Sequence, residues 1–210
     1  MLVGQQQMKK MMKSLLLILF SFLFGINSFC QSRTYKDSMQ AYINKYVKGH
    51  EMVKGNDGKY LQFFPIDKSY RVTAKIEITN DTKWFKMETS GPIKKTFRTY
   101  GIITFNIHDT IVRLHVYQSQ NLLQSEQYKN YLFIPFTDLT TGNSTYEAGR
   151  YIDIASSEIK GDEVIIDFNK AYNPYCAYVK NIYNCPIPPK ENDLPVAIFA
   201  GEKEYGKNGH

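Results

Sequence analysis

The chain has 210 residues, 43% of them hydrophobic, and a formal net charge of +6. This length suits one domain with a sizeable core. Three of the basic residues lie within residues 1–30, so the net charge of the remainder is near +3, and past residue 30 no basic run is longer than Lys94-Lys95. Such a small and interspersed charge is not typical of nucleic-acid-binding proteins, and we expect no nucleic-acid partner.

Residues 1–30 have the three-part organisation of a secretory signal peptide. A lysine-rich start precedes an apolar run at residues 15–24, which small and polar residues then break. The run is too short for a comfortable membrane span. Ser28 and Cys30 suit signal-peptidase cleavage, which places the mature start at Gln31. We therefore expect an exported protein of the periplasm or cell envelope, or a secreted one, with no transmembrane span in the mature chain.

Two other fates of this segment stay open. If it is not cleaved, it would act as an N-terminal membrane anchor. If the protein is a lipoprotein, Cys30 would carry the lipid, although Phe29 is large for the position before a lipidated cysteine.

One amphipathic helix is expected after the signal peptide. Apolar residues from Met39 to Val47 recur at the spacing of one helix face, which predicts a helix over residues 37–48. Asp37 is a suitable N-cap, and Gly49 can end the helix in a left-handed turn. We expect this helix to pack on the domain as a clasp, and a partner-binding helix is the alternative. The expected organisation is a signal peptide at 1–30, a helix and linker at 31–58, a β domain at 59–203 and a frayed tail at 204–210.

Period-two alternation dominates the rest of the chain. From Tyr70 to Thr79 apolar and polar residues alternate, which is typical of a strand with one dry and one wet face. His108-Asp109 lies between two such runs and is expected at a hairpin tip. Many short strands and one clear helix predict a mainly β fold, a single antiparallel barrel or sandwich with the helix packed on it. The expected strands are 70–79, 83–88, 96–107, 110–118, 131–136, 150–154, 163–168 and 195–200.

Two cysteines remain after cleavage, Cys176 and Cys185. An even count in an oxidising compartment favours a disulfide, which would contribute about 2.5–3 kcal/mol in the loop-entropy model. Free buried thiols are the alternative. A metal site is disfavoured because the chain has no CxxC pair and no histidine near these cysteines. We expect no metal and no cofactor.

No standard catalytic motif is present, neither a nucleophile elbow, a phosphate-binding loop, a zinc-protease motif nor a dinucleotide fingerprint. His115 shares a strand face with Arg113 and Tyr117, which favours a solvated or hydrogen-bonded side chain. A general-base role is the alternative. A hydrolase that uses carboxylates or His115 therefore stays open.

The densest polar segment, residues 138–153, joins two expected strands. Arg150 offers a planar fork of donors suited to a carboxylate or phosphate. Tyr151 adds a hydroxyl and a flat apolar face, and Asp153 adds a carboxylate. We therefore place a candidate ligand site at Arg150, Tyr151 and Asp153. The alternative is a long hairpin loop closed by an ion pair from Arg150 to Asp153 or to Asp138.

A second polar and aromatic segment spans residues 167–192. Asn169, Tyr172 and Asn173 can add amide hydrogen bonds and aromatic stacking to the same ligand site. The prolines at 186–189 preset an extended chain without sheet donors. The alternative is a stapled, irregular crossover that covers the sheet.

Four segments of the chain carry a family resemblance. They are LFIPFTD at 132–138, TYEAGRYID at 145–153, DFNKAYNPYCAY at 167–178 and CPIPPKENDLPVAIFAGEK at 185–203. Through these segments the chain resembles, over roughly residues 60–203, the bacterial and archaeal domain of unknown function 1684. The family brings no activity, cofactor or catalytic residue. The resemblance implies that the fold unit and the Asn/Tyr/Cys/Pro segment are shared structural elements.

Together these features predict an exported cell-envelope protein whose β domain binds a small molecule or a glycan-like ligand. The hydrolase described above is one alternative. The other is a structural or assembly factor of the envelope, held to its partners by the helix or by an exposed sheet edge. The sequence predicts no oligomeric state.

Overall fold

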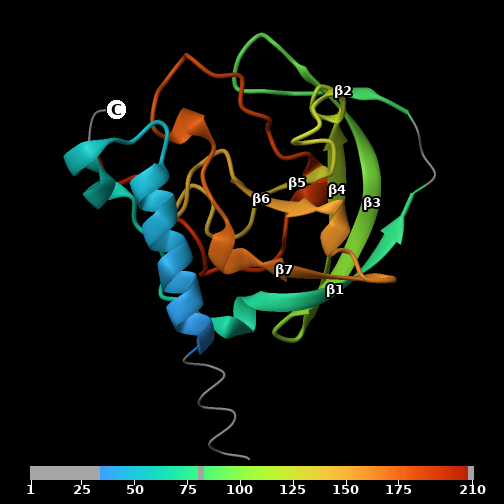
Figure 1. Cartoon of the computed structure of the whole chain (residues 1–210), viewed down its shortest axis with the longest axis horizontal. Coiled ribbons are helices and arrows are strands. Elements are labelled where there is room, and N and C mark those ends of the chain that lie inside the picture. The colour runs from blue at the N-terminus through green and yellow to red at the C-terminus, as the bar shows by residue number, and fades with distance from the viewer. Residues whose placement is uncertain (1–33, 80–82, 208–210) are drawn as a thin grey trace, which may run out of the picture. The chain divides into compact units, whose positions relative to one another are not determined.

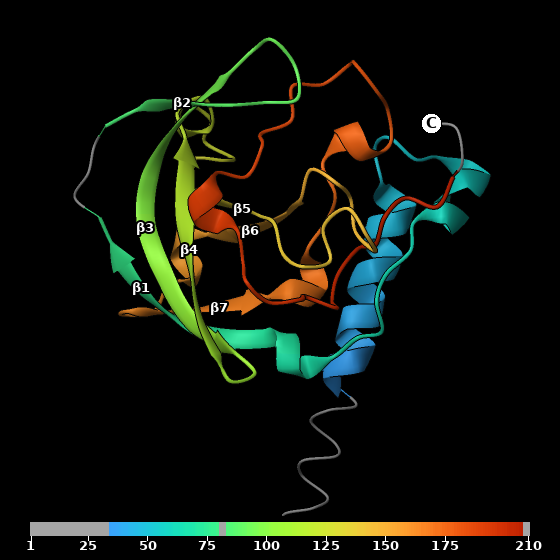
Figure 2. The same cartoon turned by 180° about the vertical axis from the view of Figure 1, so that it is seen from behind.

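The computed structural model describes residues 34–79 and 83–207, and its fold is mainly β (Figure 1). Its seven strands form one antiparallel sheet with the order β6-β5-β4-β3-β1-β7, and β2 pairs with β3 outside this path. The whole sheet belongs to one compact unit of the chain, Tyr42–His210. It curls into a half-barrel (Figures 1 and 2). The strands are β1 (Arg71–Ile78), β2 (Phe85–Met87), β3 (Lys95–Ile107), β4 (Thr110–Ser119), β5 (Tyr131–Phe136), β6 (Arg150–Ala155) and β7 (Glu163–Asp167). Short 3-10 helices are η1 (Gly55–Tyr60), η2 (Lys68–Tyr70), η3 (Leu122–Gln124), η4 (Ser156–Glu158), η5 (Phe168–Lys170), η6 (Tyr175–Ala177) and η7 (Lys190–Asn192).

The prediction of a mainly β, antiparallel fold is confirmed, with a curled single sheet rather than a sandwich. Alternation sets the faces of β1, where Ala74 and Ile76 are buried while Lys75 between them is exposed. The β3–β4 hairpin turns at the expected tip, where His108 has a φ of 50°. A tight hairpin turn favours this left-handed backbone.

Strands β5 and β6 bury side chains on both faces of the sheet. Leu132, Ile134 and Phe136 of β5 pack into the main core. Phe133 joins a second, aromatic cluster with Tyr151 of β6. Because successive side chains of a strand point to opposite faces, these strands separate two apolar clusters, and the second cluster borders the candidate site described below.

Residues 195–200 do not form the strand that we expected. The backbone oxygens of Ile198 and Ala200 accept hydrogen bonds from the Arg150 guanidinium at 3.0 and 2.5 Å. The backbone amide of Ile198 donates to Asp138 at 3.2 Å. Side chains therefore satisfy backbone groups that a neighbouring strand would otherwise satisfy, so Ile198 and Ala200 are buried without joining the sheet.

The N-terminal helix covers residues 34–49 of the described chain instead of 37–48. Asp37 consequently lies inside the helix and is not its N-cap. Gly49 is the last helical residue and does not have the left-handed φ that we expected. Instead, Nδ1 of the buried His50 accepts hydrogen bonds from the backbone amides two and three residues later, at 3.2 and 2.9 Å. This side-chain acceptor holds the turn, so no glycine with positive φ is needed there.

Residues 204–207, expected to belong to a frayed tail, are held to the β domain. The backbone amides of Glu204 and Gly206 each donate to a carbonyl oxygen elsewhere in the domain at 3.1 Å. The ammonium of Lys207 pairs with Asp57 at 2.7 Å.

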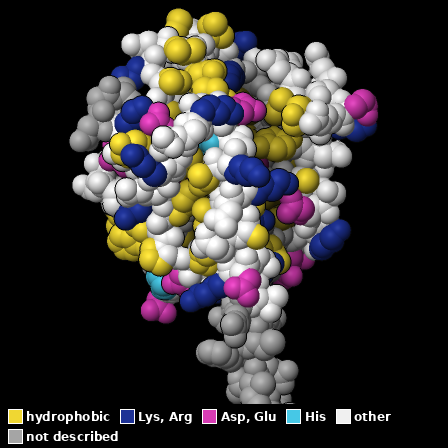
Figure 3. Space-filling view, turned by 60° about the vertical axis from the view of Figure 1, so that its left-hand side comes forward, with side chains coloured by type: hydrophobic (Ala, Val, Ile, Leu, Met, Phe, Trp, Pro, Cys, Tyr) yellow, Lys and Arg dark blue, Asp and Glu magenta, His cyan; other side chains and the backbone are white. Residues whose placement is uncertain are grey.

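The signal peptide expected at residues 1–30 lies outside the described residues, so export stays a prediction. No helix within the described ranges is long and apolar enough to cross a membrane. On the face shown in Figure 3, basic side chains are interspersed with acidic ones.

Cys176 and Cys185 form the disulfide that we expected. Replacing both cysteines by serine should lower the free energy of unfolding by about 2–3 kcal/mol, because the crosslink restricts the unfolded chain. Urea unfolding measures this loss. As a control, a reductant should destabilise the wild-type protein by a similar amount and leave the double variant unchanged. An unchanged urea midpoint in the double variant would contradict the assignment of a stabilising role.

Candidate functional site

An aromatic cavity of about 520 Å³ lies where β3, β4, β5 and β6 meet the disulfide loop. Here the disulfide loop means residues 172–186. This volume is within the range of small-molecule sites, which is roughly 300–1,000 Å³. The aromatic residues that line it are Phe97, Tyr131, Phe133, Tyr151, Tyr172, Tyr175 and Tyr183.

Strand period and register bring the sheet side of the cavity together. Tyr131 and Phe133 share one face of β5, and Tyr151 and Asp153 share the same face of β6, where Phe133 pairs with Asp153. The Phe133 ring contacts Tyr151 edge-on with centroids 4.7 Å apart, and stacks on Phe97 of β3 at 5.5 Å. Packed rings of this kind have few free rotamers, so the wall is preorganised.

The disulfide loop forms the opposite wall and is tied to β6. The backbones of Tyr151 and Tyr172 exchange two hydrogen bonds, of 2.9 and 3.0 Å. The Tyr151 hydroxyl donates to the backbone oxygen of Pro186. The Cys176–Cys185 bond closes the loop between these two attachments. The loop is therefore fixed at both ends of the segment that faces the cavity.

Asp153 gives this largely apolar cavity one negative charge. Its Oδ2 accepts a hydrogen bond from the Tyr172 hydroxyl, while its Oδ1 is buried and has no hydrogen-bond partner among the described residues. Burial raises the pKa of Asp153 to about 6, although hydrogen bonding to Tyr131 and Tyr172 acts in the opposite direction. A carboxylate with an unused acceptor at the wall of a cavity is a candidate ligand-binding group.

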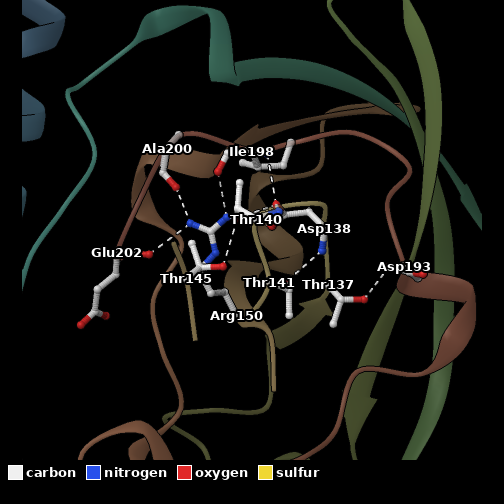
Figure 4. A network of polar contacts seen from close by, with 10 residues as sticks. All are labelled: Thr137, Asp138, Thr140, Thr141, Thr145, Arg150, Asp193, Ile198, Ala200 and Glu202. Carbon is white, nitrogen blue, oxygen red and sulfur yellow. Dashed lines mark hydrogen bonds and ion pairs between the residues drawn. The ribbon is translucent and has the colours of Figure 1, made fainter. Parts of the chain in front are cut away.

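Arg150 lies on the other side of the sheet, in a network that Figure 4 shows. Its guanidinium is fully buried. One terminal nitrogen donates to Asp138 at 2.9 Å and to the backbone oxygen of Ile198 at 3.0 Å. The other donates to the backbone oxygens of Ala200 at 2.5 Å and Glu202 at 3.2 Å. Arg150 thus anchors the C-terminal segment, through the ion pair to Asp138 that the sequence left open.

The alternation of side chains along a strand explains why the three candidate ligand residues of β6 do not share one site. Residues an odd number of positions apart on a strand point to opposite faces of the sheet. Arg150 therefore faces the C-terminal segment, while Tyr151 and Asp153 face the cavity. The structure separates Arg150 from the other two residues.

Asn169 and Asn173 are not among the described residues that line the cavity. Asn169 donates to the backbone oxygen of Asp67 at 2.8 Å and accepts from the backbone amide of Asp67 at 3.0 Å. The backbone amide of Asn173 donates to Glu202 at 3.0 Å, and its side chain donates to the backbone oxygen of Lys203 at 2.7 Å. Both asparagines connect distant chain segments. Of the three residues that we expected from the second polar segment, only Tyr172 lines the cavity.

Glu202 is a fully buried carboxylate that joins three segments. It accepts hydrogen bonds from the hydroxyls of Tyr46 at 3.1 Å and Tyr178 at 2.7 Å, as well as from the backbone amide of Asn173. Burial raises the pKa of Glu202 to about 7, against these hydrogen bonds and the positive charge of Arg150. Because Tyr46 lies on the helix and its ring meets Phe63 edge-on at 5.8 Å, the carboxylate helps to hold this part of the helix on the β domain.

His115 is not among the described residues that line the cavity. Its backbone amide donates to the side-chain oxygen of Asn192 at 2.7 Å, and the Asn192 amide donates to the backbone oxygens of His115 at 3.0 Å and Pro135 at 2.7 Å. Asn192 thereby bridges β4 and β5. Burial lowers the pKa of His115, and the nearby Glu191 raises it.

Sequence reasoning missed Phe97, Tyr131 and Phe133 as residues of the site. A signal was present, because residues 131–136 are apolar or aromatic at every position. Such a continuous run is typical of a strand that is buried on both faces. The run could have predicted a second buried face, but which strands share that face depends on long-range pairing.

Arg150→Met should lower the free energy of unfolding by about 3–5 kcal/mol, because it leaves the Asp138 carboxylate buried without a counter-charge. The matched control is Lys129→Met, which breaks an exposed pair with Glu126 of 2.6 Å and should cost less than about 1 kcal/mol. Urea unfolding of both variants measures the difference. A loss in Arg150→Met no larger than in the control would show that the pair does not hold the C-terminal segment.

Glu202→Gln should make the free energy of unfolding depend less on pH. The pKa of Glu202 is about 7 in the folded chain and 4.5 ordinarily, so its contribution to stability is complete below about pH 4.5 and is lost as the pH rises toward 7. The stability of the variant relative to wild type should therefore increase across this window, by up to about 1.4 kcal/mol per pH unit. Urea unfolding at constant ionic strength measures it. A constant difference across the window would contradict the assignment.

No curated protein matches this chain. Among solved structures, the chain is similar to an uncharacterized protein of Haloarcula marismortui whose structure was determined by NMR in solution. The two chains are 27% identical with a TM-score of 0.61, and the match covers 82% of this chain and 96% of that chain. A family model described as "Protein of unknown function (DUF1684)" matches residues 58–203. The chain therefore belongs to the DUF1684 family, as its sequence motifs indicated.

Proposed function

We propose that this chain binds a small, largely apolar molecule in the aromatic cavity. The observation that carries the proposal is the combination of about 520 Å³ of space, walls of packed aromatic rings and a single carboxylate, Asp153. Small-molecule sites are typically concave, mostly apolar and provided with a few polar groups that orient the ligand.

The preformed walls support this proposal. The β6 wall is fixed by Tyr151, which contacts Phe133 through its ring and Tyr172 through its backbone. The opposite wall is fixed by the Cys176–Cys185 disulfide. A site that needs little ordering on binding loses little conformational entropy, which favours affinity for a small ligand.

A compact apolar ligand fits this lining better than an extended glycan. Two of its polar residues, Lys95 and Asn121, are exposed and therefore lie toward the mouth. The aromatic rings and Asp153 form most of the remainder. A sugar with many hydroxyls would leave several of them without partners against such a wall, and each such buried group costs free energy.

The expected signal peptide extends the proposal to location. An exported binding protein would meet its ligand in the periplasm, in the cell envelope or outside the cell. The disulfide at the cavity wall supports this location, because disulfides persist in oxidising compartments.

Ligand-detected NMR with a panel of monocyclic aromatic and cycloaliphatic molecules tests the proposal. Wild-type protein should bind members of the panel. Ser119→Trp should weaken their binding by about tenfold or more, because Ser119 lines the cavity and the indole would occupy space that the ligand needs.

The matched control is Ser157→Trp, which introduces the same indole at an exposed serine outside this cavity. It should bind as wild type does. Thermal unfolding of both variants verifies that they are folded. The proposal fails if no panel member binds, or if both tryptophan variants bind equally well.

A further inference from the structure

We infer that the ligand of the aromatic cavity is an organic cation, a protonated amine on an apolar body, whose nitrogen is held by Asp153. This inference rests on the proposed function and adds the chemical class of the ligand. It depends on three features of the cavity: its charges, the free acceptor capacity of Asp153 and the aromatic rings around it.

The charges of the cavity differ between its wall and its mouth. Among the described residues that line it, Asp153 is the one acid and Lys95 the one base. Lys95 is exposed as a residue, although partial burial lowers the pKa of its ammonium. Asp153 takes part in no ion pair of the described chain. Within the described residues, the wall therefore offers a carboxylate that is not engaged in an ion pair.

The acceptor capacity of Asp153 suits a donor-rich group. A carboxylate has about four sites that accept hydrogen bonds. Here the hydroxyls of Tyr172 and Tyr131 stabilise the carboxylate, and its Oδ1 is buried with no hydrogen-bond partner among the described residues. An ammonium group brings up to three donors and a full positive charge, whereas a hydroxyl brings one donor and no charge. A cation would offset much of the cost of keeping this carboxylate away from water.

The aromatic rings favour the same class of ligand. The side chains of Tyr131, Tyr151 and Tyr172 line the cavity together with Asp153. The negative face of an aromatic ring attracts an ammonium within about 6 Å, by about 0.5–2 kcal/mol. An anionic ligand would instead be repelled by the carboxylate.

The pH dependence of amine binding should follow the ionisation of Asp153, because the tyrosines around it do not ionise in the same range. Electrostatic repulsion from Asp153 contributes to the raised pKa values of Tyr42, Tyr131, Tyr151 and Tyr172, with burial the largest cause for each. These phenols therefore stay neutral near neutral pH. The pKa of Asp153 is about 6, so affinity for an amine should rise by about tenfold between about pH 5 and about pH 7 as the carboxylate ionises.

The experiment compares three ligands of similar shape by NMR titration of the full protein: phenethylamine, the neutral phenylethanol and the anionic phenylpropionate. We expect wild-type protein to bind phenethylamine about tenfold or more tightly than phenylethanol at neutral pH, because a hydrogen bond between charged groups is stronger than a neutral one. Phenylpropionate should bind more weakly than both.

Asp153→Asn should remove the preference for the amine and its pH dependence while the affinity for phenylethanol is kept. The matched control, Asp109→Asn at the exposed tip of the β3–β4 hairpin, should leave both affinities unchanged. The comparison of ligands on wild-type protein needs no variant, so it decides the matter even if Asp153→Asn does not fold.

The outcomes separate this inference from the proposed function. If phenylethanol or phenylpropionate binds in the cavity as tightly as phenethylamine, the cavity is a binding site but its ligand is not a cation. If Asp153→Asn is folded and keeps the preference for the amine, the role of Asp153 is rejected. If none of the three molecules nor any member of the earlier panel binds, the proposed function itself fails.

Discussion

The buried ion pair between Arg150 and Asp138 is the interaction on which the arrangement of the C-terminal half depends. It joins β6 to the loop after β5, and its remaining donors and acceptors hold the backbone of the segment from Ile198 to Glu202 (Figure 4). Burying two charges is costly unless each is paired and hydrogen-bonded. Here the polar side-chain atoms of the pair are hydrogen-bonded, except that Arg150 Nε has no partner among the described residues. The network therefore holds the segment from Ile198 to Glu202 in position, although this segment does not belong to the sheet.

The same strands that carry this network also build the aromatic cavity. Side chains of β6 alternate between the two faces, so Arg150 anchors one side while Tyr151 and Asp153 form the other. The main core and the aromatic cluster hold the backbone of β5 from both sides. A strand packed on both faces has little freedom to shift, which keeps the cavity wall in place. Stability on one face thus provides the rigidity that a binding site on the other face requires.

Buried carboxylates occur on both sides of the sheet, with different surroundings. Glu202 accepts hydrogen bonds from two tyrosine hydroxyls and a backbone amide, so its acceptor sites are largely used within the protein. Asp153 is stabilised by the hydroxyls of Tyr172 and Tyr131, and its Oδ1 is buried with no hydrogen-bond partner in the part of the chain that the structure describes. A carboxylate whose acceptors are satisfied serves the fold, whereas one with free acceptors beside a cavity is suited to a ligand. This contrast distinguishes a structural acid from a candidate binding residue.

The sequence by itself determined the strand positions, the hairpin at His108 and the cysteine pair, because these follow from local period, turn chemistry and a count of thiols. It also contained the alternation that separates Arg150 from Asp153. It failed at residues 195–200, where a short apolar run suits a strand but side chains satisfy the backbone instead. Only the tertiary structure decided which aromatic residues meet Asp153, since that depends on pairing between strands far apart in the chain. Local patterns fix which face a side chain takes, and long-range packing fixes what it meets there.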